Sequence, residues 1–582
     1  MKSNQSFFNK TVFQKNLTRF APCWGLYTVG LLMALVSLID SGSQWFAPNV
    51  CDFVQIMGLI TFCYALLCTQ LLFGDLYNSR MCNALHAMPL KRETWFVTNV
   101  LSGFAFHLIP TVIFAVLAGI YGLFGSCNMA WLAAPVWLLG VNLQFICFFG
   151  IAVFSAFCVG NRFAQAVIYG ILNFASLIIG WLVDTIFLPM YYGIKINMEP
   201  FFWFSPAGQM TQEPFCNHTA TYRYDEWDPG TLERGANFGY YFLVAAVGIA
   251  LLLLAMQLYR RRKLECAGDF MAVKGLESVF LVVYTVILGT VFHFISDEIF
   301  GMETWFFLFL GQAVGWFTGR MLLERTPRVF RLKNYLHCGL VMVIFTLVLG
   351  AAYLDPFGIE SWVPEREDVK SVTIADGHYN YHSAELTMEE PEEIRKLIQI
   401  HEEALHNNQF GLEYVITFED AYEELILKEE AASMNFSMSF TITYEMKNGR
   451  TVKRDYNIWM GGETGTYLNE LFSSPEAVLQ VEDAATFAAI HRDLYIRDTW
   501  EGRETFVRSE GDIRSLYEAI LADCEAGTMA QNSNFHGPDV NLYWINSDNG
   551  LDILVFSNCE NTLNWLREYG VEVDELIERY TG

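Results

Sequence analysis

Runs of mostly apolar residues fill the first 353 positions of this 582-residue chain. A helix of about 20 such residues crosses the hydrocarbon core of a bilayer, where every backbone polar group must be bonded internally. We place nine runs at about 21–39, 53–74, 96–124, 130–158, 164–188, 239–258, 278–296, 303–319 and 335–353. Pro110 and Asn142 fall within two of the longer runs, where a tilt, kink or break is open. The chain is therefore expected to be a multi-pass membrane protein.

Charge divides the chain at the same place. Asp and Glu number 18 before position 354 and 45 after it, against 21 and 16 for Lys and Arg. The first part is thus near neutral and the tail strongly acidic. We expect an all-α polytopic membrane domain of about nine transmembrane helices, followed by a C-terminal soluble α+β domain. An acidic tail argues against a nucleic-acid partner, since binding phosphate requires clustered Lys and Arg.

The loops between the runs indicate an orientation. If the N-terminus is cytoplasmic, the inner segments hold 18 Lys and Arg and the outer loops only three, namely Lys195, Arg223 and Arg234. Basic residues accumulate on the cytoplasmic side. Nine crossings then place the tail outside the cell, whereas an even number would place it inside. Localisation in the cell membrane, with an extracellular tail, is the expectation.

A basic amphipathic pattern precedes the first run. Apolar residues recur at helical spacing among Lys10, Lys15 and Arg19, at positions Phe8, Val12, Phe13, Leu17 and Phe20. Such a pattern is typical of a helix lying in the membrane interface. A partly ordered terminus is the alternative.

The loop between the second and third runs carries the strongest functional signal. It is long enough for one short helix with Met81, Ala84, Leu85 and Met88 on one face, ended by Pro89. Lys91 and Arg92 follow, where they can reach lipid headgroups. Two interpretations stay open from the residues alone. One is a juxtamembrane turn with basic anchors, and the other is a helix that passes force from a soluble motor to the spans.

The same loop resembles the first cytoplasmic loop of ABC-2-type exporter permeases, especially those of Gram-positive bacteria. The resemblance rests on Arg80, Leu85, His86, Pro89, Lys91 and Arg92. The stretch 97–103 is similar to the start of that family's third span, and the amphipathic N-terminus to its interfacial helix. In that family the loop is a coupling helix that docks on a separate ATPase subunit, which implies this role for those six residues.

The resemblance implies a domain organisation and a function. Residues 1–20 would be the interfacial helix, 21–258 a six-helix permease core, 259–353 three additional spans that depart from the core, and 354–582 the acidic extracellular domain. The chain would be the permease subunit of an ATP-driven exporter and not itself an enzyme. Its partners would be two copies of a separate ATPase, a second permease half, identical or homologous, and the lipid bilayer.

No nucleotide site is expected in the chain itself. A phosphate-binding P-loop requires Gly-Lys, and that dipeptide is absent from the sequence. No cofactor, metal site or catalytic residue is expected either. The alternative function is a membrane-anchored sensor or interaction protein whose tail recognises an envelope ligand.

Polar residues within the runs are candidates for function because they are costly in a bilayer. Asp184 is the sharpest, either on a transport path or, as we favour, at the outer interface. His107 and His293 are expected to hydrogen-bond neighbouring helices. The aromatic cluster at 201–204 in the long outer loop indicates an interfacial belt or a short re-entrant helix.

The tail has the pattern of an α+β domain. Pro391 opens a helical run, and strands at 436–444 and 452–458 flank an Asn448-Gly449 turn typical of a hairpin. Helices are expected over 475–495, 510–526 and 560–580. The hairpin resembles a domain of uncharacterised function at the C-terminus of some of these permeases. Whether Cys524 and Cys559 pair is open.

One stretch in the tail is similar in sequence to the zinc-binding motif of zinc proteases. His401 and His406 bracket two glutamates, but they are five residues apart instead of four and point about 140° apart on a helix. They are therefore not expected to share a metal ion. A solvated helical face is the interpretation we favour for this stretch.

Overall fold

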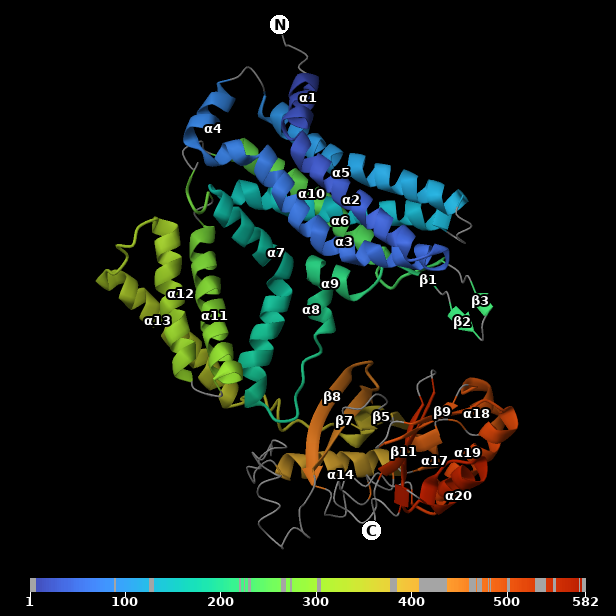
Figure 1. The fold of residues 1–582 in the computed structure, drawn as a ribbon. Coiled ribbons are helices and arrows are strands. Elements are labelled where there is room, and N and C mark those ends of the chain that lie inside the picture. The colour runs from blue at the N-terminus through green and yellow to red at the C-terminus, as the bar shows by residue number, and fades with distance from the viewer. Residues whose placement is uncertain are drawn as a thin grey trace. The chain divides into compact units, whose positions relative to one another are not determined.

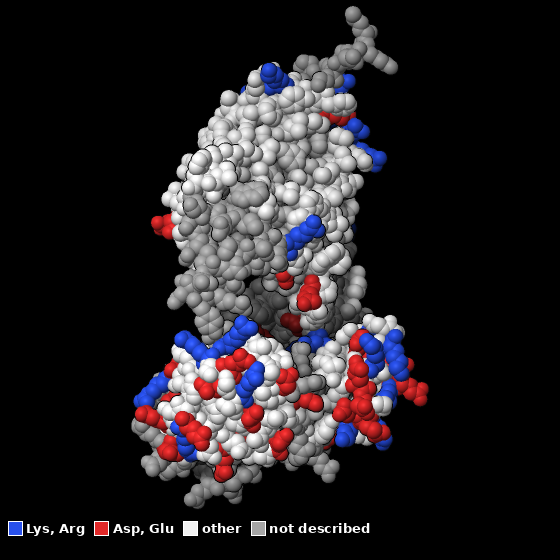
Figure 2. Space-filling view, turned by 90° about the vertical axis from the view of Figure 1, so that its right-hand side faces the viewer, with Lys and Arg blue, Asp and Glu red and all other residues white. Residues whose placement is uncertain are grey.

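The computed structural model describes residues 7–87, 91–124, 130–218, 221–223, 226–228, 232–262, 268–272, 275–300, 305–376, 385–407, 437–459, 467, 471, 474–479, 481, 483–492, 494–499, 503–528, 541–547, 551–574 and 576–577. The chain separates into two compact units. The helical unit comprises Met1–Phe187 and Ile196–Gly350, and the α+β unit comprises Leu188–Lys195 and Ala351–Gly582. Figure 2 shows that charged residues crowd the surface of the α+β unit, whereas the visible face of the helical unit is largely free of them.

Among the described residues, nine helices are long and apolar enough to cross a membrane, as expected. Their bounds are α2 (Ala21–Asp40), α3 (Ser43–Leu72), α5 (Arg92–Phe124), α6 (Ala130–Cys158), α7 (Arg162–Leu182), α10 (Phe238–Arg261), α11 (Leu276–Phe294), α12 (Trp305–Glu324) and α13 (Leu332–Tyr353). The two long runs in which a kink or break was possible form continuous helices, α5 with Pro110 inside it and α6 with Pro135 inside it.

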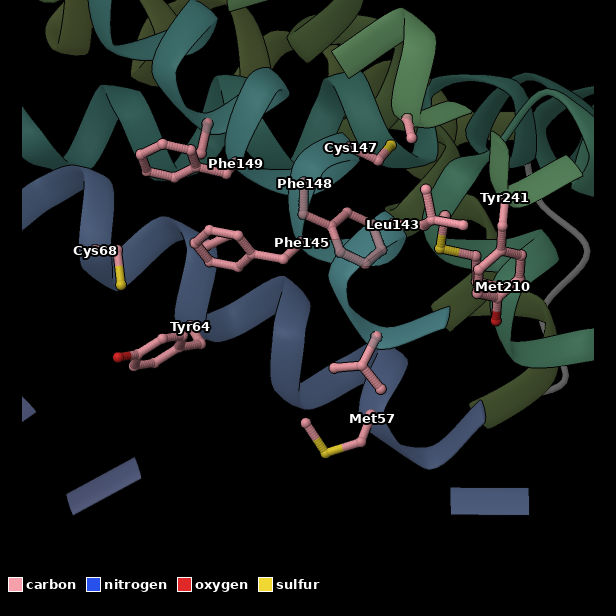
Figure 3. Packing of buried hydrophobic residues seen from close by; sticks show 14 of the residues in the cluster. Met57, Tyr64, Cys68, Leu143, Phe145, Cys147, Phe148, Phe149, Met210 and Tyr241 are labelled. Atoms are coloured by element: carbon pink, nitrogen blue, oxygen red, sulfur yellow. The ribbon is translucent and has the colours of Figure 1, made fainter. Parts of the chain in front are cut away.

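The core of the helical unit forms around α6, which contacts α3, α5 and α10 (Figure 1). Phe145, Phe148 and Phe149 of α6 are fully buried in this cluster (Figure 3). The backbones of α6 and α10 touch, because a Cβ atom added to Gly150 would lie 2.3 Å from the carbonyl oxygen of Gly248. Small residues permit such close approach between membrane helices, where packing replaces the hydrophobic effect as the main attraction.

Glycines also join α11 to α12. Gly311, Gly315 and Gly319 recur every fourth residue along α12 and face α11. A Cβ atom added to Gly315 would lie 3.0 Å from the Cα atom of Thr285, and one added to Gly311 would lie 2.7 Å from the carbonyl oxygen of Leu288. The spacing is visible in the sequence and identifies the contact face of α12.

Two short helices follow α7 in the helical unit, α8 (Glu199–Trp203) and α9 (Pro206–Gln212). The Ser205 hydroxyl between them donates to the carbonyl oxygen of Asn173, in the middle of α7, at 2.7 Å. Ser205 is fully buried, and Met210 of α9 is buried in the main core. The two helices thus form a short helical hairpin that packs on α7 and α3. Its position in the membrane, as an interfacial belt or a re-entrant helix, stays a prediction.

In its described residues, the α+β unit contains two four-stranded antiparallel sheets. The first has the order β6-β5-β7-β8, from β5 (Val369–Asp376), β6 (Glu385–Met388), β7 (Ser437–Met446) and β8 (Thr451–Trp459). The expected hairpin is β7–β8, turned by Gly449 with φ of 81°. The expected helix is α14 (Pro391–Asn407), which buries Ile394 and Leu397.

The second sheet has the order β10-β9-β11-β12 and was not expected from the sequence. It consists of β9 (Leu494–Asp498), β10 (Glu504–Val507), β11 (Asn541–Ser547) and β12 (Asp552–Phe556). The accompanying helices are α17 (Pro475–Leu479), α18 (Ala484–Ile490), α19 (Glu510–Glu525) and α20 (Glu560–Tyr569).

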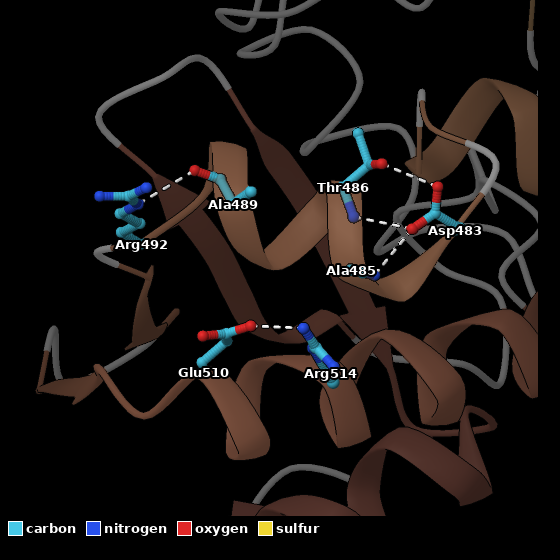
Figure 4. A network of polar contacts seen from close by, with 7 residues as sticks. All are labelled: Asp483, Ala485, Thr486, Ala489, Arg492, Glu510 and Arg514. Atoms are coloured by element: carbon cyan, nitrogen blue, oxygen red, sulfur yellow. Dashed lines mark hydrogen bonds and ion pairs between the residues drawn. The ribbon is translucent and has the colours of Figure 1, made fainter.

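The prediction of a single helix over 475–495 is wrong, because the chain forms two short helices and the start of β9 there. The Asp483 carboxylate accepts hydrogen bonds from the backbone N–H groups of Ala485 and Thr486 and so begins a new helix there (Figure 4). That helix ends at Ile490, and β9 starts at Leu494. Capping therefore replaces the single helical stretch by two short helices and a strand.

Candidate functional site: the loop after α3

The expected short helix is present in the loop after α3. A 3₁₀ turn, η1 (Gly74–Tyr77), leads into α4 (Ser79–His86), where the Asn78 side chain accepts a hydrogen bond from the backbone N–H of Arg80 at 3.0 Å. Cys82 is buried, whereas Arg80, Met81 and Ala84 are exposed. The side chains of Leu85 and His86, and all of Met88 and Pro89, lie outside the described residues. The exposed side of α4 thus includes two residues of the expected apolar face.

The turn before α4 is fixed to the start of α7. The Tyr77 hydroxyl donates to Oε1 of Gln165 at 2.7 Å, and Nε2 of Gln70 donates to the carbonyl oxygen of Arg162 at 3.1 Å. Gly74 lies against the Arg162 guanidinium, where an added Cβ atom would come within 3.0 Å of Nη2. A displacement of α4 would therefore act on α3 and on α7 together.

Arg92 is engaged with the protein itself. Its Nη1 donates to the carbonyl oxygens of Tyr259, Arg260 and Arg262, at 3.2, 3.3 and 3.3 Å, at the C-terminal end of α10. A cation at a helix C-terminus satisfies unpaired carbonyl groups and the negative end of the dipole. The neighbouring Glu93 pairs with Arg260 at 3.2 Å. Lys91, in contrast, is exposed. The sequence indicated lipid headgroups for both basic residues, but the contacts of Arg92 are to α10.

The amphipathic N-terminal segment is the helix α1 (Lys10–Arg19), and it docks on α5 through polar contacts. Nδ2 of Asn16 donates to Oδ1 of Asn99 at 2.8 Å and to the Ser102 hydroxyl at 3.1 Å. Asn99 and Ser102 are buried within the helical unit. Helix α1 is thus bonded to the same helix, α5, that begins at Arg92.

A cavity of about 700 Å³ lies at the other end of this unit, between the α8–α9 hairpin and the start of α10. Trp203 and Tyr240 line it and pack edge to face against each other, with ring centroids 5.5 Å apart. Glu199 and Glu213 also line it, and the described lining residues include no Lys or Arg. Aromatic faces and carboxylates together suit an amphiphile with a cationic end.

Asn237 holds the wall of this cavity in place. The residue is buried, and its Nδ2 donates to the carbonyl oxygens of Gln209 and Glu213, both at 2.8 Å. Its Oδ1 accepts from Nε2 of Gln209 at 3.0 Å. These bonds join α9 to the beginning of α10, so the cavity is built on a satisfied polar framework.

The polar residues noted within the spans have different surroundings. Asp184 is exposed on the π-helical turn Val183–Phe187 that ends α7, and it does not line the cavity. His107 is fully buried and stacked on Phe145 at 4.1 Å, with the backbone of Val141 within reach, yet neither ring nitrogen makes a hydrogen bond of normal geometry. His293 stacks on Trp305 at 5.3 Å. Ring stacking is thus a contact that both histidines share.

The interpretation of a solvated helical face is wrong for His401. Its side chain is fully buried, with Nδ1 3.0 Å from the Tyr444 hydroxyl and Nε2 2.7 Å from the Tyr456 hydroxyl. Burial, followed by the nearby Arg454 charge, lowers the pKa of His401 to about 4. The imidazole therefore serves as a neutral polar link between α14 and the β7–β8 hairpin. Within the described residues, no group of three His, Cys, Asp or Glu side chains is placed to hold a metal ion.

The segment Leu188–Lys195 is part of the α+β unit, although it lies in the sequence between α7 and α10. Its Gly193 carbonyl oxygen accepts the backbone N–H of Asp455 at 3.0 Å, and Lys195 pairs with the Asp455 carboxylate at 3.0 Å. Gly193 has φ of 73°, and an added Cβ atom would lie 2.0 Å from the Tyr456 ring. The sequence assigned these residues to the permease core, and no local pattern signals their pairing with β8.

Cys524 and Cys559 are both buried thiols outside any disulfide, and the Cys559 Sγ donates to the carbonyl oxygen of Thr528 at 3.4 Å. The structure thus contains no bond between them. No protein-family model, no curated protein and no solved structure matches this chain.

Proposed function

We propose that the chain is the membrane-spanning subunit of an ATP-driven ABC exporter, coupled through residues 80–92 to a separate ATPase. The observation that carries the proposal is α4, a short helix that exposes Arg80, Met81 and Ala84 while Cys82 is buried. A docking helix requires an exposed face and a rigid attachment. The bonds from η1 and from the end of α3 to the start of α7 supply that attachment.

Contacts around this loop extend to four spans. The α3 helix leads into α4, η1 is bonded to α7, and Arg92 at the start of α5 is bonded to the end of α10. A force on α4 would therefore reach α3 and α7 directly, and α5 and α10 through the adjoining chain. That arrangement suits a permease whose spans alternate between two states as nucleotide is bound and hydrolysed elsewhere. Two ATPase copies and a second permease half would complete the assembly.

The proposed orientation has the N-terminus inside the cell and the α+β unit outside. The distribution of 18 inner against three outer basic residues supports it. The two segments that form the α+β unit give independent support for an even number of crossings between them. Leu188–Lys195 and Ala351–Gly582 belong to one unit and must therefore lie on the same side. The four apolar helices α10 to α13 between them satisfy that requirement.

Under this proposal, the cavity beside α8 and α9 would be a station for exported amphiphiles with a cationic end. Dodecyltrimethylammonium, with dodecyl sulfate for comparison, tests this with the purified full chain in nanodiscs. Replacing Glu199 and Glu213 by Gln should weaken binding of the cation by about five- to tenfold and leave the anion unaffected. Equal binding of both detergents would contradict the assignment.

The coupling role is tested by purification in mild detergent from cells that express the full chain at native level. The chain should recover an ATPase, and Met81→Asp with Ala84→Asp should lose it, as should Leu85→Asp with His86→Asp. Leu332→Asp is the matched control, since Leu332 is 77% exposed, lies in an inner segment by the charge rule and is far from α4 in the sequence.

Each outcome has a clear meaning. Loss of the ATPase with both α4 variants, but not with Leu332→Asp, supports docking at α4. Retention of the ATPase and of ATP-dependent activity in both α4 variants would show that the docking site lies elsewhere. Recovery of no ATPase by the unmodified chain would overturn the proposed function and favour the membrane-anchored sensor.

A further inference from the structure

Two cysteine pairs lie at opposite ends of the helical unit. Cys51 of α3 and Cys216 of β1 (Cys216–His218) are both 2% exposed, and their thiols are within hydrogen-bonding reach of each other. Cys23 of α2 and Cys68 of α3 form a second adjacent pair. All four are free thiols in the structure. In chain order, the first pair lies near the start of α3 and the second near its end.

The position of Cys216 beside Cys51 follows from a series of contacts along α3. An added Cβ atom on Gly58 would lie 3.9 Å from the carbonyl oxygen of Met210, and the Gln55 side chain donates to the carbonyl oxygen of Thr211. Next to Gln55, the side chain of Val54 lies with that of Phe215 against the same glycine, Gly140. The chain from 210 to 216 thus runs antiparallel to α3, and Cys51 is the next residue of α3 on that face.

We propose that Cys51 and Cys216 form a disulfide bond in the mature protein, while Cys23 and Cys68 stay reduced. The reason is location: by the proposed orientation the first pair lies at the outer face of the membrane and the second at the cytoplasmic end. Disulfides persist in oxidising compartments and are rare in the cytosol. This inference rests on the proposed orientation and not on coupling to an ATPase.

The chemistry is exchange with an external disulfide, such as that of an envelope thiol oxidoreductase. The thiolate of one cysteine attacks the oxidant and forms a mixed disulfide, releasing one oxidant thiolate. The second cysteine then attacks that mixed disulfide, and the second oxidant sulfur leaves as thiolate. The two cysteines give up two electrons and two protons, and the oxidant is reduced to two thiols. Since both thiols are buried in the folded protein, exchange takes place before β1 packs on α3.

The bond would fix the strand pair β1–β4 to α3. Strand β4 (Leu232–Arg234) pairs with β1, and Glu213 of the cavity lies three residues before Cys216. A covalent link at Cys51 would therefore hold one wall of the outer cavity to the helix that leads to α4.

Differential alkylation of the full chain tests the proposal. Cells are grown with oxidised glutathione, which does not cross the membrane, so that new chains meet a disulfide oxidant as they fold. N-ethylmaleimide in denaturant blocks free thiols, and iodoacetamide labels those released by reduction. Cys51 and Cys216 should carry the second label, and Cys23 and Cys68 the first. The digest made without reduction should contain the Cys51 peptide linked to the Cys216 peptide.

Cysteine variants show which of the two pairs is oxidised. Cys51→Ser should return Cys216 to the first label, and Cys23→Ser should change nothing at the outer pair. The first label on Cys51 and Cys216 of the unmodified chain overturns the proposal. A link between Cys23 and Cys68 instead would overturn the orientation as well, whereas ATPase recovery judges the proposed function separately.

Discussion

At the scale of single residues, Arg92 was predicted to reach lipid headgroups but instead binds the end of α10. Its guanidinium caps the C-terminal carbonyl groups of α10 and lies 5.6 Å from the centroid of the Tyr259 ring. From the sequence alone, Lys91 and Arg92 are equivalent, because nothing near them reveals that residues 259–262 are close in space. The candidate site therefore contains one residue with a role in internal structure beside others that are exposed.

Replacing Arg92 by Ala should lower the stability of the purified full chain. Three carbonyl groups at the end of α10 would lose their donor, which costs about 1–2 kcal/mol for a partly buried cap. The midpoint of thermal unfolding, measured in detergent by intrinsic fluorescence, should fall. Lys91→Ala is the control, because Lys91 is exposed, and an equal fall in both variants would contradict the capping role.

His401 should make the α+β unit sensitive to mild acid. Its pKa is lowered to about 4 in the folded chain from an ordinary value near 6.5, so the neutral form is the one that folding favours. The unfolded chain takes up a proton first as the pH falls. The contribution of neutral His401 to the free energy of unfolding is therefore complete above about pH 6.5. It is lost progressively towards pH 4, by on the order of 2 kcal/mol.

Thermal unfolding of the unit between pH 7 and pH 4.5 checks this for the full chain and for His401→Gln. The variant should be less stable at pH 7 but should lose less of its stability on acidification. His491, whose pKa is also lowered by burial, remains as a background contribution of the same sign. An identical pH dependence in the two proteins would contradict the role of His401.

At the scale of elements, spacing in the sequence predicted most of the helices and the β7–β8 hairpin. The apolar runs are long, and the Asn448-Gly449 turn is a strong local signal. The second sheet has one comparable signal, the Asn549-Gly550 dipeptide between β11 and β12, but its strands are only four to seven residues long and its central pair, β9 and β11, is separated in the sequence by α19. The sequence did not decide how residues 201–204 are arranged, for a similar reason. The burial of the α8–α9 hairpin depends on the Ser205 bond to Asn173, which lies 32 residues away in α7.

Gly315→Leu should separate α12 from α11. The new side chain would meet the backbone of Thr285, and overpacking of this kind costs about 1–3 kcal/mol or displaces the helix. Gly339→Leu in α13 is the matched control, since an added Cβ atom there meets nothing within 4 Å. A cysteine pair placed across α11 and α12 should cross-link less efficiently in Gly315→Leu only, and equal cross-linking in both variants would argue against this contact.

The contact of Gly193 with β8 gives a second prediction at this scale. Gly193→Val should loosen Leu188–Lys195, because the side chain would collide with Tyr456 and the backbone has a left-handed φ of 73°. Gly449→Val has a similar φ of 81° but no neighbour within 4 Å, so it isolates the backbone strain. Hydrogen exchange of residues 190–195 should rise in the first variant and stay unchanged in the second.

For the whole molecule, the side of the membrane on which the α+β unit lies is the most consequential prediction. Protease added to intact cells should remove an epitope tag placed after Gly582 and spare one placed before Met1. Both tags should be cut in permeabilised cells. A protected C-terminal tag would contradict the nine-span arrangement, and with it the location of the outer cavity and of Cys51.

The pairing of Leu188–Lys195 with β8 also has a consequence for biosynthesis. The ribosome makes this segment long before it makes β8, and four apolar helices are synthesised in the interval. Leu188–Lys195 therefore has no β8 to bind until the last apolar helix and the hairpin β7–β8 have been translated. A polypeptide that starts at residue 354 lacks this segment, so the natural unit for expression must include residues from the middle of the chain.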